Sequence, residues 1–328
     1  MYVTVTIDTE EEWDWNAGWP TGEPLSTNVA ALPRFQSLAD DFGIAATYFV
    51  NYAVMADERA CETMHQVAQH DRVEWGMHIH PWNTPPFTEE RLVRPKESFL
   101  HNHPDEVINA KLTTVYESFR KQGLRPTSFR GGRYSSGGPI HTFLRDHGFL
   151  ADASVLPLTT WPEEGAPNYR DRDLKPVRLA PRFEGDGPFW EIPLSLGFSR
   201  SPFRFYRSCY ERIERSWLAK LRLIGISERL GLVRRIWLNF ESDHCERYRD
   251  LLAALREQGV PHLCFTVHSS SLRAGPGPYT RSAADEERIF ARIEDAFRWI
   301  SQSGDFRPVT VSQLAVHLET EYYARHRN

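Results

Sequence analysis

The sequence predicts an α/β fold in which helices alternate with the strands of a parallel sheet, open or closed. Short runs rich in β-branched and aromatic residues alternate with longer segments whose apolar residues recur at helical spacing. This alternation is typical of a parallel sheet. Polar clusters follow several of the strand-like runs, which is where α/β barrels gather catalytic residues. The 328 residues, 41% of them hydrophobic, can form one domain of barrel size.

Each element is predicted from its residue pattern. Seven segments are expected to be buried strands because they are rich in sheet-forming residues: 2–7, 46–50, 73–77, 127–130, 149–152, 189–194 and 262–267. The helical pattern at 104–122 has both end signals, a proline with two acids at its start and Gly123 after its last turn. Further segments have apolar residues at helical spacing and are predicted to be helices: 28–42, 139–147, 246–258 and 284–302.

Two regions interrupt this alternation. Residues 156–190 contain many prolines, glycines and charges without periodicity, which indicates an inserted ordered loop or hairpin. Residues 211–236 place Ile213, Trp217, Leu221 and Ile224 among seven basic and three acidic side chains. This pattern predicts a basic amphipathic helix that packs on the barrel, with peripheral membrane contact as the alternative.

The composition limits the possible binding partners and the cellular compartment of the protein. The formal net charge of -5 disfavours a nucleic-acid partner. The four cysteines are scattered without C-x-x-C spacing, which indicates reduced thiols. The chain opens directly on a strand pattern, and no apolar run approaches the ~18 residues of a membrane span. We therefore expect a soluble cytoplasmic protein without a transmembrane segment, whereas the sequence leaves its oligomeric state open.

Two polar clusters have the residue types of a metal site. Asp8 and Glu10 are two residues apart at the end of the first strand, so their side chains should point the same way. One carboxylate can bind a divalent cation while the other acts as a general base. His78 and His80 are also two apart and can reach one ion. The alternatives are a solvated acidic loop and a chance H-x-H pair among thirteen histidines.

Three further candidates follow strand-like runs. Arg130 can hold a catalytic carboxylate in its ionised form and orient it, or it can be an ordinary surface cation. Asp152 can brace the ring nitrogen of a histidine, or it can be a turn acid before Ser154. His268 can protonate an amine leaving group, although single histidines are more often structural. No phosphate-binding loop, G-x-S-x-G elbow or H-E-x-x-H helix is present in the sequence.

Taken in order, these clusters resemble the polysaccharide deacetylases of carbohydrate esterase family 4, the NodB-like group, over about residues 2–315. The motif TIDTEEEW is similar to the family variant whose two acids are separated by one residue, which implies Asp8 as base and Glu10 as metal ligand. EWGMH is similar to the second motif and implies His78 as a ligand. The family's second histidine usually lies four residues after the first, and this sequence has Trp82 there. The resemblance therefore leaves His80 as the third protein ligand of a divalent metal, with zinc expected.

The remaining motifs extend the resemblance. Arg130 with Tyr134 is similar to the third motif, which implies an arginine that orients the base and a backbone oxyanion donor at Tyr134. Asp152 followed by Ser154 is similar to the fourth motif, and the histidine of TVHSSSL to the fifth. The resemblance implies that His268 protonates the leaving amine and that Asp152 tunes it. Trp82, Tyr134, Ser154 and Trp161 are then candidate substrate-binding residues.

The resemblance implies a distorted (β/α)7 barrel of the glycoside hydrolase/deacetylase type, with residues 1–328 as one polysaccharide-deacetylase-like catalytic domain. Its implied reaction is hydrolysis of an N-acyl group, usually N-acetyl, from an amino sugar of a glycan or glycan precursor. Two alternatives stay open at this point. One is a metal-independent amidohydrolase that acts on a small amide, and the other is a carbohydrate-binding barrel without catalysis.

Overall fold

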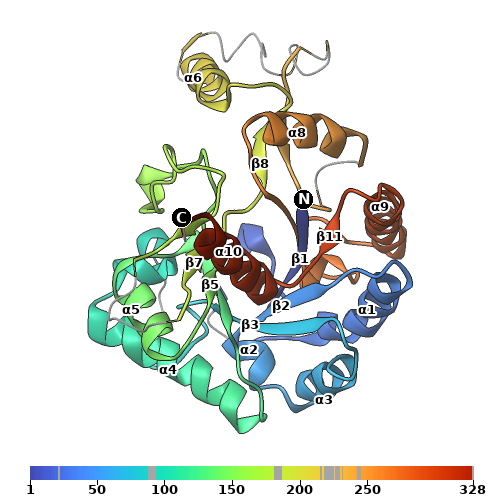
Figure 1. The fold of residues 1–328 in the computed structure, drawn as a ribbon. Coiled ribbons are helices and arrows are strands. Elements are labelled where there is room, and N and C mark those ends of the chain that lie inside the picture. Colours follow the sequence, from blue (N-terminus) through green and yellow to red (C-terminus); the bar gives the residue numbers. More distant parts are fainter. Residues whose placement is uncertain are drawn as a thin grey trace.

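The protein is built around one curled sheet. The computed structural model describes residues 1–20, 23–87, 94–180, 187–214, 216–217, 225, 230, 232–241 and 245–326. Within them the strands of the main sheet lie in the order β10-β1-β2-β3-β4-β5-β7-β6, and β11 pairs with the first residues of β1 outside this path (Figure 1). The pairs from β10 to β7 are parallel, and β6 joins antiparallel to β7. This confirms the α/β fold of the distorted barrel type.

The strands match the sequence prediction closely. Each of the seven predicted segments overlaps an observed strand, because apolar β-branched runs are stable where both faces of a parallel sheet are covered. The short strands β6, β8, β9 and β11 were not predicted. The strands are β1 (Tyr2–Thr9), β2 (Ala46–Val50), β3 (Val73–Ile79), β4 (Ser128–Gly131), β5 (Ala151–Asp152), β6 (Val177–Arg178), β7 (Trp190–Glu191), β8 (Leu196–Phe198), β9 (Arg235–Trp237), β10 (His262–His268) and β11 (Arg307–Pro308).

The predicted helices are present and cover the outside of the sheet (Figure 1). The pattern at 28–42 divides into a 3-10 turn at Thr27–Ala31 and then α1, with Pro33 in the first turn of α1, where proline is tolerated. The sequence patterns missed α2, α3, α6 and α10. The helices are α1 (Leu32–Asp41), α2 (Tyr52–Met55), α3 (Glu58–Val67), α4 (Asp105–Lys121), α5 (Gly138–Asp146), α6 (Phe203–Glu214), α8 (Cys245–Glu257), α9 (Ala283–Gln302) and α10 (Val311–His326). None of the described helices combines the length and apolar character that a membrane span requires.

Irregular segments complete the barrel between β7 and β10. The backbone N–H of Thr266 in β10 donates to the carbonyl of Leu238 at 2.9 Å, and the N–H of Leu238 donates to the carbonyl of Ser195 at 2.9 Å. At the opposite end of the strands, α10 covers the points where β2 and β3 begin. The N–H of Val311 donates to Thr47 Oγ1 at 3.1 Å. The carboxyl ends of the strands therefore stay free to carry a site.

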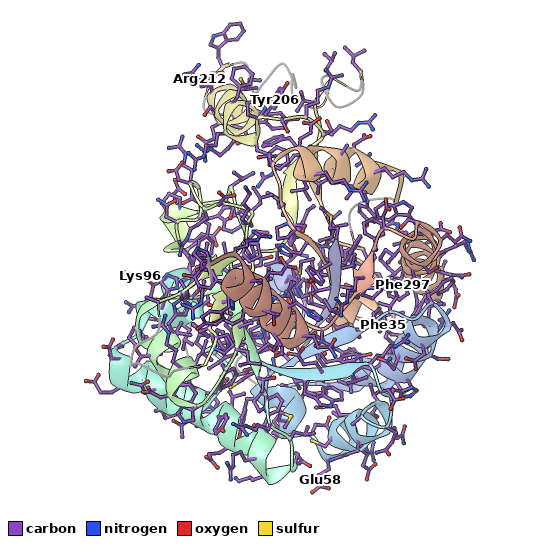
Figure 2. All side chains as sticks on the ribbon, viewed as in Figure 1. Phe35, Glu58, Lys96, Tyr206, Arg212 and Phe297 are labelled. Carbon is purple, nitrogen blue, oxygen red and sulfur yellow. The ribbon has the colours of Figure 1, made fainter. Side chains whose placement is uncertain are left out.

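Most of the hydrophobic core lies in one cluster between the sheet and its helices, and a smaller cluster lies under α10. Phe35 of α1 and Phe297 of α9 are fully buried and pack edge to face, with ring centroids 5.9 Å apart (Figure 2). Helix α6, with Tyr206 and Arg212 labelled at the top of the same view, joins this core through the buried side chains Phe203 and Tyr210 (Figure 2).

The structure describes the two interrupting regions to different extents. The described part of 156–190 is irregular apart from a 3-10 turn at Pro162–Glu164 and strand β6, which forms a hairpin with β7. Half of the expected helix at 211–236 lies outside the described residues; residues 211–214 belong to α6, and the last two residues of the range lie in β9 instead. At those last two residues, pairing of β9 with β8 replaces the expected helix. Leu221 and Ile224 lie outside the described residues, whereas Trp217 is 71% exposed.

Candidate active site

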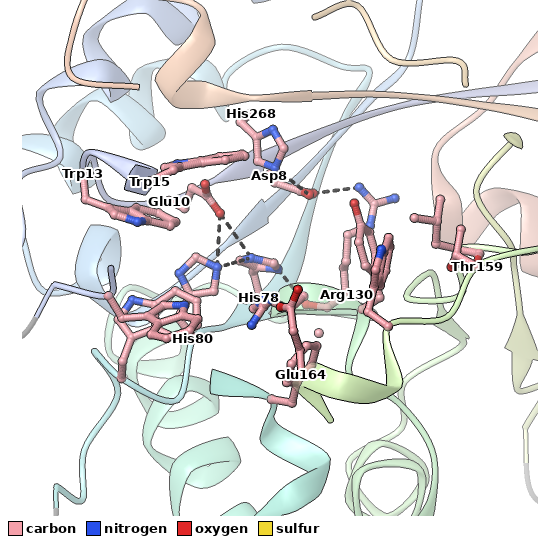
Figure 3. Close-up of a pocket in the computed structure, with 18 of the residues that line it drawn as sticks. Asp8, Glu10, Trp13, Trp15, His78, His80, Arg130, Thr159, Glu164 and His268 are labelled. Carbon is pink, nitrogen blue, oxygen red and sulfur yellow. Dashed lines mark hydrogen bonds and ion pairs between the residues drawn. The ribbon is translucent and has the colours of Figure 1, made fainter. Parts of the chain in front are cut away.

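Four parallel strands bring polar side chains to one edge of the sheet. The carboxyl ends of β1, β3, β4 and β10 carry Asp8, His78, Arg130 and His268. Asp8 lies opposite His268 in the sheet register, and His78 lies opposite Arg130. All four line one cavity of about 780 Å³ (Figure 3). The common position predicted from the sequence is therefore a single site.

A glycine lets two of these strand ends approach closely. Gly132 follows β4 and lies against the histidine that follows β3. A Cβ atom at Gly132 would lie 2.3 Å from Cδ2 of His80 and 2.5 Å from the carbonyl oxygen of Ile79, and contacts this short do not occur between such atoms. The Gly-Gly pair after Arg130 thus permits the close approach of the two backbone segments.

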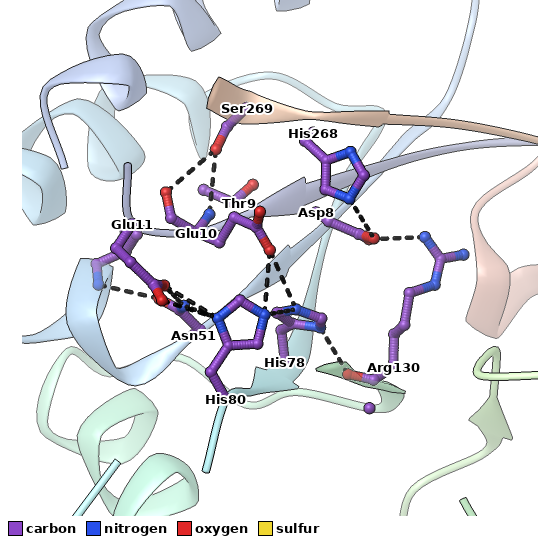
Figure 4. A network of polar contacts seen from close by, with 12 residues as sticks. Asp8, Thr9, Glu10, Glu11, Asn51, His78, His80, Arg130, His268 and Ser269 are labelled. Carbon is purple, nitrogen blue, oxygen red and sulfur yellow. Dashed lines mark hydrogen bonds and ion pairs between the residues drawn. The ribbon is translucent and has the colours of Figure 1, made fainter. Parts of the chain in front are cut away.

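Glu10, His78 and His80 form a candidate metal centre. Each side chain is at least 96% buried, and their ligand atoms lie within 4.8 Å of one another. Oε2 of Glu10 is 3.5 Å from Nε2 of His78 and 3.2 Å from Nε2 of His80, and the two Nε2 atoms are 3.0 Å apart (Figure 4). Two ligands on one tetrahedral zinc ion, at bond lengths of 2.0–2.1 Å, are separated by about 3.3 Å. The spacing fits one ion.

The hydrogen bonds of the two rings support the same conclusion. Nδ1 of His78 faces the carbonyl oxygen of Arg130 at 2.7 Å, and Nδ1 of His80 faces the Glu11 carboxylate at 3.0 Å. Because both partners are acceptors, each Nδ1 is assigned as the N–H donor, which leaves a lone pair on each Nε2. These lone pairs converge with Glu10, whose Oε1 is buried without a hydrogen-bond partner among the described residues. Converging buried acceptors require a cation or an added proton.

The pKa values of Glu10 and His80 also indicate that this cluster favours an added positive charge. Burial opposes ionisation of Glu10, but His268 and His80 together hold its pKa well below the usual range. Burial likewise disfavours the charged form of His80, whereas Glu11 and Glu10 raise its pKa to about 10. A proton on His80 balances these carboxylates in the absence of a metal ion, and a divalent ion would replace that proton.

Asp8 is held by a buried arginine. Nη1 of Arg130 donates to Oδ1 of Asp8 at 2.7 Å, and the Arg130 side chain is 1% exposed. The guanidinium also donates to the carbonyl of Ala153 at 3.0 Å and to Oγ1 of Thr6 at 2.9 Å. It further lies over the ring of Phe49 at 4.5 Å. These contacts orient the Asp8 carboxylate and compensate its charge, as the sequence predicted for a strand-end arginine.

The carboxylate that contacts His268 is Glu241 and not Asp152, which the resemblance implied. Nδ1 of His268 lies 2.9 Å from Oε1 of Glu241, whose side chain is fully buried. Nε2 is 4.0 Å from Oδ2 of Asp8. Burial lowers the pKa of His268, but the carboxylates of Glu241, Glu10 and Asp8 raise it to about 10. Sequence reasoning missed Glu241, although this acid follows the apolar run RIWLNF in the same way as the other clusters follow theirs.

Asp152, expected to tune His268, contacts other groups. Its Oδ1 accepts from the N–H of Ser154 at 2.9 Å and from the hydroxyl of Ser154, and its Oδ2 accepts from Ser136 and lies 2.8 Å from Nε2 of His141. Ser154 in turn accepts from the N–H of Gly131 at 2.8 Å. Asp152 and Ser154 are both fully buried and are not among the residues lining the cavity. The expected contact is wrong, because β5 points this carboxylate toward the segment that follows β4.

Aromatic side chains form much of the cavity wall. Tyr134 and Trp161, predicted to bind substrate, stack with ring centroids 6.2 Å apart and an interplanar angle of 26°. Trp82 also lines the cavity but is only 6% exposed, and it stacks on His80 at 4.2 Å. Burial and the charge of Asp8 raise the pKa of Tyr134 well above its usual value, so this phenol is neutral. Sequence reasoning missed four further tryptophans of the wall: Trp13, Trp15, Trp19 and Trp237.

Comparison with known proteins addresses the fold. No protein-family model matches the sequence, and no curated protein matches it. Among solved structures, a Mycobacterium smegmatis protein assigned as a polysaccharide deacetylase is 16% identical; the match covers 98% of this chain and 91% of that one, with a TM-score of 0.58. The peptidoglycan deacetylase PdaC from Bacillus subtilis is 12% identical over 99% and 95% of the two chains, with a TM-score of 0.43. A 4-alpha-glucanotransferase from Thermococcus litoralis is 9% identical over 95% and 39%, with a TM-score of 0.49. The first likeness shows that the chain has the (β/α) barrel type of fold of the polysaccharide deacetylases.

Proposed function

We propose that this protein is a divalent-metal-dependent hydrolase that removes an N-acyl group, in the first instance N-acetyl, from an amino sugar of a glycan or glycan precursor. One observation carries the proposal. A cluster suited to one metal ion, a carboxylate paired with arginine, and a histidine paired with glutamate face the same cavity. These are the parts that acyl transfer to water requires, namely a Lewis acid, a general base and a general acid.

Glu10, His78 and His80 would hold the ion, and zinc suits one carboxylate with two imidazoles and a coordination position left open. When bound, the ion supplies Lewis-acid polarisation of the acyl carbonyl and lowers the pKa of the attacking water. Asp8 is positioned to accept the proton of that water, because its Oδ1 is fixed by Arg130 while its Oδ2 faces His268. The Asp8 carboxylate is the general base of the proposal.

His268 is the general acid of the proposal. Breaking the C–N bond leaves an amine that must gain a proton, and an imidazolium can donate it. Burial lowers the pKa of His268, but the Glu241 carboxylate beside Nδ1 raises it and so favours the protonated ring. The proton is then carried by Nε2, the ring nitrogen that faces Asp8 and the cavity. The backbone N–H of Tyr134 is the proposed donor to the developing oxyanion.

The wall of the cavity favours a sugar as substrate. Sugar rings present apolar C–H faces that pack on aromatic rings, and the stacked Tyr134–Trp161 pair offers such a surface. Trp161 is 39% exposed, so its ring is accessible at the rim. The expected cytoplasmic location and peripheral membrane contact stay predictions. The observation behind the second is the exposed set Phe205, Trp217, Leu230 and Leu232.

The test combines metal content with product release. Purified protein is expected to contain about one zinc ion per chain and to release acetate from at least one N-acetylated amino sugar in a panel of monomers, oligomers and polymers. Chelation should abolish release and added zinc should restore it. Asp8→Asn should lose turnover and keep the metal, whereas Glu10→Gln should lose both.

Other results would select another function. Full turnover in metal-free protein would favour a metal-independent amidohydrolase. Glycan binding without release of acetate from any substrate, unchanged in His268→Ala, would favour a carbohydrate-binding barrel.

A further inference from the structure

A third carboxylate, Glu11, lies behind the candidate metal centre. Its side chain is fully buried and does not face the cavity. Oε1 lies 3.0 Å from Nδ1 of His80 and accepts from Nε1 of Trp82 at 2.9 Å. Oε2 lies 3.1 Å from the same Nδ1 and accepts from Nδ2 of Asn51 (Figure 4). Both oxygens are therefore engaged by side chains that surround His80.

We propose that Glu11 is a positioning residue that makes His80 a metal ligand, with Trp82 and Asn51 holding Glu11 in place. The inference rests on the metal site of the proposed function. A carboxylate that accepts from Nδ1–H fixes the tautomer of a ligating imidazole, orients the ring and makes it a better donor through Nε2. Glu11 meets these conditions, because His80 directs Nε2 toward Glu10 and His78 while Nδ1 faces Glu11.

Trp82 restrains His80 in two ways. Its ring stacks on the imidazole with centroids 4.2 Å apart and an interplanar angle of 23°. Its Nε1–H holds Oε1 of Glu11, so ring and carboxylate are fixed by the same side chain. The tryptophan thus occupies the position where the family resemblance led us to expect a second histidine, and it supports the ligand that replaces that histidine.

The charges around Glu11 agree with this role. Asn51 and Trp82 are neutral donors, and an uncompensated buried carboxylate is costly. A divalent ion bound by His80 would balance the two negative charges of Glu10 and Glu11, while Arg130 already compensates Asp8. Glu11 therefore belongs to the electrostatic balance of the centre, although it is not a ligand itself.

The experiment measures zinc binding and needs no substrate. Metal-free protein is titrated with Zn²⁺ against a chromophoric chelator of known affinity, for the wild type, Glu11→Gln and Trp82→Phe. Loss of a carboxylate behind a ligating histidine weakens metal affinity about 10–100-fold, and this loss is expected for Glu11→Gln. Trp82→Phe keeps the stacked ring but removes the Nε1–H donor, so a smaller loss is expected.

Glu74→Gln is the matched control. Glu74 is also a buried carboxylate with several donors, including Ser128 and the N–H of Ser312 at 2.9 Å, but it lies at the opposite end of the barrel. Its substitution should lower thermal stability without changing zinc affinity. The NMR signal of the His80 Nδ1–H in zinc-loaded protein adds a readout that general destabilisation would not move, because Glu11→Gln should weaken the hydrogen bond of this N–H and shift its proton signal upfield.

The outcomes separate this inference from the proposed function. Equal zinc affinity in wild type and in folded Glu11→Gln overturns the role of Glu11 and leaves the proposed function standing. Weaker zinc binding by Glu11→Gln, in a protein that releases no acetate from any substrate, supports the role of Glu11 and contradicts the reaction. A wild type that binds no zinc overturns both. If Glu11→Gln does not fold, unchanged affinity in Trp82→Phe overturns the inference, and a loss of about threefold or more supports it.

Discussion

The pairing of His268 with Glu241 leads to a prediction about the pH dependence of turnover. Glu241→Gln keeps the shape of the side chain and removes its charge. Both Glu241 oxygens lie within 3.0 Å of Nδ1 of His268, and the carboxylate is fully buried. Two unit charges about 4 Å apart interact by about 4 kcal/mol at an effective dielectric constant of 20. Partial compensation by the remaining amide hydrogen bond reduces the effect, so we expect the pKa of His268 to fall by about 1–3 units.

The direction follows from the role of His268 as an acid. Burial lowers the pKa of His268 but Glu241 raises it, so the protonated form is present below that pKa and is lost as the pH rises through it. Glu241→Gln lowers this pKa, and the alkaline limb of kcat should move to lower pH by the same amount. The variant should therefore lose most activity in the alkaline range and least at acidic pH. The assay is acetate release at saturating substrate across the pH range, with zinc supplied throughout.

Asp152→Asn is the control, because it alters the carboxylate that the sequence had favoured for this role. Asp152 contacts Ser136, His141 and Ser154, so its substitution should leave the alkaline limb in place whatever its effect on the rate. An alkaline limb that moves in Asp152→Asn and stays in Glu241→Gln would refute the assignment of Glu241.

Three further substitutions test the geometry of the site. Arg130→Met leaves the Asp8 carboxylate buried without its partner, so the free energy of unfolding measured in urea should fall by about 3–5 kcal/mol; an unchanged value would contradict the buried pair. Gly132→Ala places a methyl group against His80 and should weaken zinc binding in a competition titration, whereas unaltered affinity would mean that this contact relaxes freely. Trp161→Ala removes an aromatic ring that is 39% exposed, so it should raise KM for a glycan severalfold with little change in Tm, since stacking contributes about 0.5–1.5 kcal/mol. An unchanged KM would remove Trp161 from the substrate surface.

Local pattern was enough to locate most of the candidate site. Four of its residues each follow an apolar strand-like run: Asp8, His78, Arg130 and His268. The end of a strand can be predicted from the sequence because the alternating pattern and the β-branched residues stop there. Parallel strands in a barrel align their carboxyl ends, so side chains far apart in the chain could be expected together. The two-residue spacing of His78 and His80 likewise implied one shared face.

Contacts between segments far apart in the sequence decided the partners of His268 and Asp152. Glu241 reaches His268 because residue 239 bridges to Thr266 of β10, and no local pattern encodes a pairing across so many residues. Asp152 was misassigned for the same reason, since the side chains around a buried carboxylate are set by the neighbouring strand and loop.

The sequence by itself determined which residues stand at the ends of the strands, because strand periodicity is a local property. Only the tertiary structure decided which of them lie in contact, including the placement of Glu11 and Trp82 against His80. Hydrogen-bond partners depend on register and on the approach of loops, which packing of the whole chain sets.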